Sequence, residues 1–153
     1  MFITDTATIE TLTIAYVNDA MRASISSDIS MTRTDRDEAK TWRGESGRHG
    51  AKASARMQTI ETIDRTLAQA ITGAFYTIEE EAKAAVREHY GIDGRMVDII
   101  KTLGEDYGSV FDVALAGLED KAREQAAKIA ARRAAELEAC LLYTSDAADE
   151  EDS

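Results

Sequence analysis

Proline is absent from all 153 residues of this chain, although average usage of about 5% would place several in a sequence of this length. Proline interrupts helices because it lacks a backbone N–H and its ring clashes with the preceding turn. Its absence therefore permits long, uninterrupted helices, and the frequent alanine, glutamate and arginine residues favour them. With 44% hydrophobic residues, the chain can bury the core of one ordinary domain.

Other features are also missing, and each absence excludes a class of protein. No apolar run approaches the roughly 18 residues of a membrane-spanning helix, and the N-terminal residues lack the basic and apolar stretches of a secretory signal. The single cysteine, Cys140, allows no internal disulfide. We therefore expect a soluble, cytoplasmic protein that makes no contact with a membrane.

The C-terminal segment 140–153 differs from the rest of the chain. Residues 140–150, CLLYTSDAADE, resemble the conceptual translation of a transposon-end sequencing adapter over eleven consecutive positions. A natural acidic tail is the alternative, since charged C-termini are common. The resemblance implies a non-native tail after a single helical domain of residues 1–139, whose true C-terminus is then unknown. Without the tail the chain loses five acids and no bases, and its formal charge changes from −11 to −6.

The spacing of apolar residues predicts an all-α protein, a bundle of about four helices with a long C-terminal helix. In the first segment, about 5–26, two apolar stripes face opposite sides of one helix, although its threonine-rich start is also compatible with a strand. A helix that is apolar on two sides is usually central in a bundle or covered by a partner. The last helix is expected from Ser109 to Glu138, and a short helix at about 93–103 precedes it.

Residues 54–90 carry the clearest amphipathic stripe in the sequence. Thr77 and Glu80 match a capping box, which would begin a new helix there unless the segment forms one long helix. Gly91 is expected to end the segment, because glycine readily takes the left-handed conformation that closes helices.

The segment 27–53 is polar, and we expect it to be partly mobile. Asp35 followed by Glu38 fits a helix start, so a short helix at about 35–43 is predicted, with Gly44 ending it. An irregular stretch of this length would be uncommon inside a compact domain.

Residues that suit catalysis or metal binding are few. The two histidines, His49 and His89, occur in neither a Glu-x-x-His nor a His-Glu-x-x-His pattern, so neither predicts a helical metal site. The evenly spaced Gly44, Gly47 and Gly50 follow no strand and precede no Lys-Ser/Thr pair, so they predict no phosphate-binding loop. We therefore predict no catalytic residue, no metal site and no cofactor.

Positive charge gathers in the segment 33–56. Seven bases and four acids there give a balance of +3, whereas the rest of residues 1–139 carries −9. Such a segment with the only tryptophan could contact nucleic acid, because lysine and arginine neutralise phosphates and an aromatic ring stacks on bases. It is also compatible with pairing to the chain's own acidic surface, or with an ordinary solvated segment. The candidate nucleic-acid-binding residues are Arg33, Arg36, Lys40, Trp42, Arg43 and Arg48.

Three functions remain open at this point. The first is a non-enzymatic helical interaction or assembly protein, self-associating or bound to a protein partner, whose long last helix has a spacing compatible with a coiled coil. The second is a nucleic-acid-associated protein that uses residues 33–56. The third is a helical enzyme whose site is completed by residues missing after residue 139, and no residue present supports it.

Overall fold

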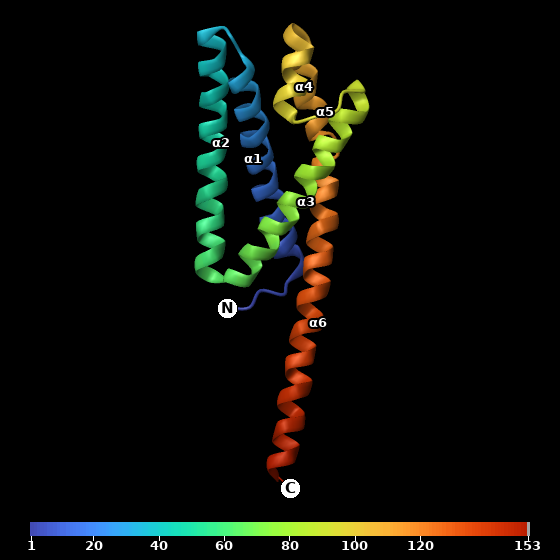
Figure 1. Ribbon diagram of the computed structural model, residues 1–153. Coiled ribbons are helices and arrows are strands. Elements are labelled where there is room, and N and C mark those ends of the chain that lie inside the picture. Colours follow the sequence, from blue (N-terminus) through green and yellow to red (C-terminus); the bar gives the residue numbers. More distant parts are fainter. Residues whose placement is uncertain (153) are drawn as a thin grey trace.

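The computed structural model describes the backbone of residues 1–152 and the side chains of residues 1–143. All regular structure in that part of the chain is helical, which confirms the predicted all-α fold with a long C-terminal helix (Figure 1). Of the tail predicted to be non-native, 140–153, the side chains from residue 144 onward lie outside the described residues. In chain order the elements are α1 (Thr6–Thr32), α2 (Arg36–Ile63), α3 (Arg65–Tyr90), α4 (Met96–Leu103), the 3-10 helix η1 (Gly104–Tyr107), α5 (Gly108–Leu115) and α6 (Leu118–Asp152).

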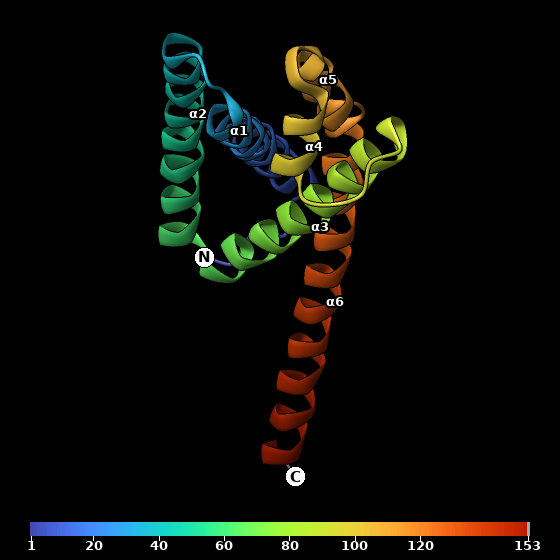
Figure 2. The ribbon, with the colours of Figure 1, turned by 45° about the horizontal axis from the view of Figure 1, so that its top comes forward.

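α1 lies at the centre of the bundle, with α2 along one side and with α3 and α6 on its other sides (Figures 1 and 2). One of its apolar stripes is mostly buried and the other is mostly half-buried, and at most 1% of the surface of Ile9, Val17, Met21, Ile25 and Ile29 is exposed. Each of these side chains contributes roughly 1.5–3 kcal/mol through burial. The first segment is therefore a helix and not a strand, and its two-sided pattern is satisfied by helices of the same chain.

The core has two parts along the length of α1. In one part, Met21 of α1 packs with Ile99 of α4 and with apolar side chains of α3, α5 and the start of α6. In the other part, Ile9 packs with Ile71 of α3 and Ile129 of α6, close to the corner between α2 and α3. The two parts together hold all the long helices against α1.

The structure of the segment 27–53 differs from the prediction, because the segment is helical except for a short turn around residues 33–35. Asp35 caps α2 as expected, and its side chain accepts a hydrogen bond from the Glu38 N–H at 2.8 Å. The helix does not stop at Gly44, however, and continues to Ile63. Glycine costs a helix roughly 1 kcal/mol relative to alanine, so packing must offset that cost here.

Close packing against α1 supplies this compensation. Ala39 and Ala53 of α2 are buried, and the Ser46 hydroxyl donates to the Ala23 carbonyl of α1 at 2.9 Å. Gly50 faces the same residue, and a Cβ atom placed on it would lie 3.8 Å from the Ala23 Cβ atom. Ala39, Ser46, Gly50 and Ala53 therefore form the face of α2 that lies along α1, whereas Gly44 and Gly47 are exposed and meet no atom within 4 Å.

Two helix boundaries also lie elsewhere than predicted. The segment 54–90 divides at Asp64, whose side chain caps α3 by accepting from the Leu67 N–H at 3.2 Å. Thr77 lies inside α3 and donates to the Gly73 carbonyl, so no helix begins there. The expected single last helix is split into α5 and α6 at Gly117, which has a left-handed φ of 66°. The predicted end at Gly91 is confirmed, with a φ of 65°.

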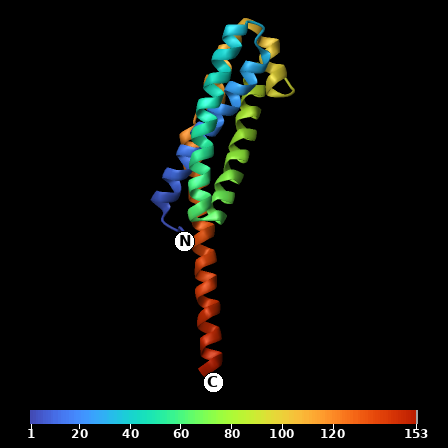
Figure 3. The same cartoon turned by 90° about the vertical axis from the view of Figure 1, so that its left-hand side faces the viewer.

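α6 extends well beyond the bundle (Figures 1 and 3). Its side chains are buried at intervals as far as Arg133, and from there to Tyr143 all of them are exposed. None of the helices formed by the described residues is long and apolar enough to cross a membrane.

Candidate binding cleft between α1, α2 and α5

The six candidate nucleic-acid-binding residues divide into two groups in the structure. Arg33 and Trp42 point inward, whereas Arg36, Lys40, Arg43 and Arg48 are exposed on α2. The Arg33 side chain is only 7% exposed, and its guanidinium lies 3.8 Å from the centre of the Tyr107 ring. Its Nη1 atom donates to the Gly104 carbonyl at 3.2 Å, so this arginine joins the α1–α2 turn to η1.

Trp42 also packs against Tyr107, with the two ring centres 6.2 Å apart. Its Nε1–H donates to the Tyr107 hydroxyl at 3.1 Å, and its ring centre lies 5.9 Å from that of Phe111. The Tyr107 hydroxyl in turn donates to Glu38, and burial followed by this hydrogen bond raises the pKa of Tyr107. The tryptophan ring is therefore partly buried, and its exposed part lines a cleft rather than the side of α2 that carries Arg36, Lys40 and Arg43.

The exposed bases form an outward face of α2. Arg36, Lys40 and Arg43 follow each other at steps of four and three residues, which places them on one side of the helix. Among the described residues, these three and Lys52 are in no ion pair, whereas Arg48 pairs with Glu45 at 2.5 Å. Pairing with the chain's own acids, one of the alternatives that the sequence left open, therefore holds for only part of the basic segment.

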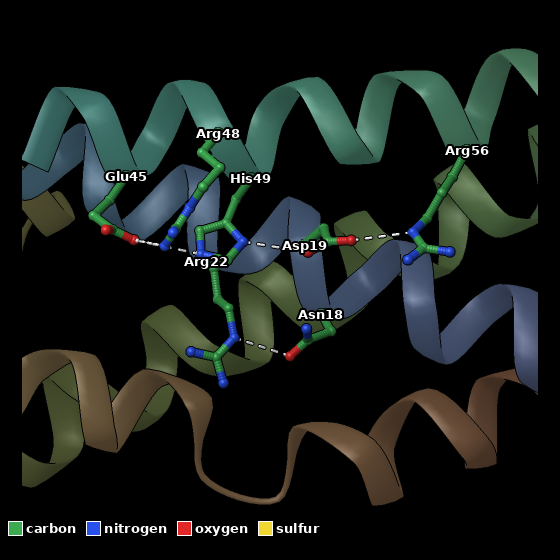
Figure 4. A network of polar contacts seen from close by, with 7 residues as sticks. All are labelled: Asn18, Asp19, Arg22, Glu45, Arg48, His49 and Arg56. Atoms are coloured by element: carbon green, nitrogen blue, oxygen red, sulfur yellow. Dashed lines mark hydrogen bonds and ion pairs between the residues drawn. The ribbon is translucent and has the colours of Figure 1, made fainter.

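A network of charged groups connects α1 and α2 (Figure 4). Asp19 of α1 is only 6% exposed, and its two carboxylate oxygens face different residues of α2. One oxygen lies 3.2 Å from His49 Nδ1, and the other accepts from Arg56 Nε at 3.1 Å. The buried carboxylate is thus fully paired, as a charge in the interior must be.

His49 also lies close to a second carboxylate. Its Nε2 atom is 3.6 Å from Glu45, one turn earlier in α2. Both ring nitrogens therefore face carboxylate oxygens, and neither is directed at a serine, threonine or cysteine. Since a general base needs a free nitrogen within reach of the group that it deprotonates, this arrangement serves to connect helices.

A cleft of about 590 Å³ lies beside this network, between α1, α2 and α5. Residues of α1 and α2 and Phe111 of α5 line it. Asn18 and Arg22 also line the neighbouring depression toward Leu115 and Leu118, so the hollow continues along α1. The residues that line the cleft are Asn18, Arg22, Ser26, Thr41, Trp42, Glu45, Arg48, His49 and Phe111.

The sequence pointed to Trp42 and Arg48 of this cleft but not to the residues of α1 in and beside it. Asp19 and Arg22 lie in a stretch of α1 with apolar neighbours such as Val17 and Met21. A carboxylate inside an apolar helix is a signal for a buried, paired charge, since unpaired charges are rarely buried. The sequence carries that signal for Asp19, but nothing in it identifies His49 and Arg56 as the partners.

Among the described residues, no group of three or more histidine, cysteine, aspartate or glutamate side chains is arranged to hold a metal ion. Comparison of the chain with protein-family models, with curated proteins and with solved structures finds no match.

Proposed function

We propose that this chain is a non-enzymatic helical interaction protein that self-associates through the part of α6 beyond the bundle. The observation that carries the proposal is the exposure of an apolar stripe on this extension. Leu137 is 40% exposed, and Leu141 and Leu142 are 63% and 61% exposed. A helix without tertiary contacts is only marginally stable in water, so the extension gains from a partner that covers it.

The stripe on the extension continues the one that packs inside the bundle. Ala126, Ile129 and Ala130 are buried against the core, and Leu137 and Leu141 follow at helical spacing on the same helix. Such three-four spacing lets two helices pack their apolar seams against each other. A second copy of the chain offers the same seam, so two extensions lying side by side would cover one another.

The two apolar sides of α1 do not support self-association in this fold. The two apolar sides of α1 suggested a need for a partner, but α2, α3 and α6 of the same chain already cover them. The proposal therefore depends on α6 alone, and Leu137 is the part of the exposed stripe that precedes the adapter-like segment 140–150.

The test is the molar mass of the full chain in solution, measured by light scattering after size exclusion over a range of concentrations. We expect a dimer or higher oligomer that Leu137→Glu converts to monomer. Met31→Glu is the matched control, because Met31 is 61% exposed at the far end of α1. A chain that stays monomeric at high concentration contradicts the proposal. A chain ending at Ala139 that becomes monomeric would show that the association depends on the adapter-like residues, which also contradicts it.

A second candidate function, nucleic-acid binding, is supported by the unpaired bases on the outward face of α2. Arg36, Lys40 and Arg43 lie on one side of α2 and span about 10 Å at 1.5 Å per residue, whereas Lys52, sixteen residues after Arg36, falls on nearly the opposite side of the helix. A row of this kind can follow the phosphates of a nucleic acid. Because Trp42 points inward, this candidate function does not include stacking on a base, and electrostatic contact is the only interaction left to it.

This candidate function predicts binding that weakens steeply with salt. Replacing four bases together (Arg36, Lys40, Arg43 and Arg48) with glutamine should reduce the slope of log affinity against log salt by about 3 to 4 on duplex DNA. The control replaces four exposed bases of other helices: Arg65, Lys101, Lys128 and Arg132. Binding to duplex DNA that is absent at low salt, or equal effects of the two sets, would count against the candidate function.

A further inference from the structure

We infer that the cleft around Arg22 is a binding site for a small organic anion, specifically an aromatic ring that carries a carboxylate. This inference is independent of self-association, because the residues that line the cleft belong to α1, α2 and α5, whereas the extension is the far part of α6 (Figure 1).

The cation that would bind the carboxylate is Arg22. Its side chain is half-buried, its Nε atom donates to Asn18 Oδ1 at 3.0 Å, and its guanidinium carbon lies 5.6 Å from the centre of the Phe111 ring. Figure 4 shows its two terminal nitrogens turned away from Asn18. Among the described residues Arg22 forms no ion pair, so both terminal nitrogens can donate to a ligand. The contact with Asn18 fixes the position of the planar guanidinium before any ligand arrives.

The acids around the cleft are already paired with other bases. Asp19 is bound by His49 and Arg56, and Glu45 is bound by Arg48. Glu119, which lines the depression next to Arg22, pairs instead with Arg123 at 3.0 Å. The Arg22 charge is thus left without a counterion from the protein, which favours an anion from solution.

The walls of the cleft favour an aromatic ligand over a bare anion. The Trp42 and Phe111 rings line it together with the side chain of Thr41. Its volume of about 590 Å³ is within the usual range of roughly 300–1,000 Å³ for small-molecule sites, and the two rings are its apolar part among otherwise polar side chains. The planar guanidinium of an arginine binds a carboxylate through two parallel hydrogen bonds, and its position beside Phe111 places the body of the ligand among the rings.

The experiment uses the full chain and the fluorescence of Trp42, which is the only tryptophan and lines the cleft. Benzoate is the probe, benzamide is the uncharged molecule of the same shape, and inorganic phosphate is the anion without a ring. We expect a saturable change with benzoate at concentrations up to about 1 mM, and little change with the other two. Arg22→Gln should weaken benzoate binding at least about tenfold, because it removes charged hydrogen bonds.

Two further variants make the result specific. Arg65→Gln removes an exposed arginine of α3 outside the cleft and should bind benzoate like the unaltered chain. Arg22→Lys keeps the charge but not the planar fork, so it should bind more weakly than the unaltered chain, and it replaces Arg22→Gln if that variant does not fold. A fluorescence change that never saturates, equal effects of benzoate and benzamide, phosphate binding as tight as benzoate binding, or undiminished binding by the Arg22 variants would each overturn the inference.

Discussion

Asp64 and Arg133 form a buried ion pair between residues 69 positions apart, which connects the corner between α2 and α3 to α6. Asp64 also accepts from the Ile3 N–H at 2.7 Å, and Arg133 donates to the Ile3 carbonyl at 2.8 Å. The Thr66 hydroxyl is shared, since it donates to Asp64 and accepts from Arg133. One pair of side chains therefore fixes the N-terminal residues, the start of α3 and the last buried turn of α6.

Removing the cation of this pair should destabilise the fold strongly. Arg133→Met leaves the Asp64 carboxylate buried without a counterion, and the two side chains are only 5% and 3% exposed in the pair. We expect a loss of about 3–5 kcal/mol in the free energy of unfolding, measured by chemical denaturation. Arg132→Met is the matched control, because Arg132 is exposed and should change stability by no more than about 0.5 kcal/mol. Equal losses for the two variants would mean that the ion pair contributes little.

The same pair predicts a loss of stability in acid. Burial pushes the pKa of Asp64 upward, but hydrogen bonds from Ile3, Leu67 and Thr66 and the charge of Arg133 outweigh burial, so the net shift is downward. An acid with a lowered folded pKa stabilises the fold above its unfolded pKa of about 3.9. That contribution is lost as the pH falls through the folded pKa.

The measurement is the free energy of unfolding of the unaltered chain and of Asp64→Asn between about pH 7 and pH 2. We expect the unaltered chain to be clearly more stable at pH 7, and the two curves to approach each other below about pH 4. A difference that stays constant over the whole range would exclude a contribution from the ionisation of Asp64.

Local sequence signals identified much of this fold. The double stripe of α1, the cap at Asp35 and the glycine end at Gly91 depend on residues close together in the chain, and each is found where it was predicted. The helix through Gly44 was missed because its stability comes from packing along α1, which outweighs a weak local preference. The corner at Asp64 was missed because its capping residue interrupts an apolar stripe that reads as continuous.

The candidate site was less accessible to prediction because its contacts are distant in sequence. Trp42 is 65 residues from Tyr107, and Asp19 is 30 residues from His49. Composition alone placed Trp42 in a basic, exposed segment, and only the tertiary fold shows that it faces inward. For the same reason, no local sequence pattern predicts that Arg22 lies against Phe111, because the two residues meet only in the folded chain.

Asp28 on α1 should lower the stability of the protein at neutral pH. Burial raises the pKa of Asp28, while Lys83 lowers it and Glu79 raises it, with a net upward shift. An acid with a raised folded pKa favours the fold when protonated and reduces stability as the pH rises above its unfolded value. Asp28→Asn should therefore raise the thermal midpoint at pH 7 and leave it nearly unchanged at about pH 3. Asp112→Asn, at an exposed position of α5, should show no comparable gain. The same gain at both pH values would assign the effect of Asp28→Asn to packing.

Two glycine-to-alanine substitutions should change stability in opposite directions, although neither added methyl group would meet another atom within 4 Å. Gly117, between α5 and α6, has a left-handed φ of 66°, whereas Gly44 lies within α2. Gly117→Ala places an L-residue in a disfavoured conformation and should cost about 1–2 kcal/mol. Gly44→Ala replaces glycine, which favours a helix less than any residue except proline, and should raise stability by up to about 1 kcal/mol. Both values can be obtained from chemical denaturation of the full chain. A loss of stability for Gly44→Ala would indicate that residues 44–53 do not form a regular helix in solution. The local sequence alone predicts that absence of a helix.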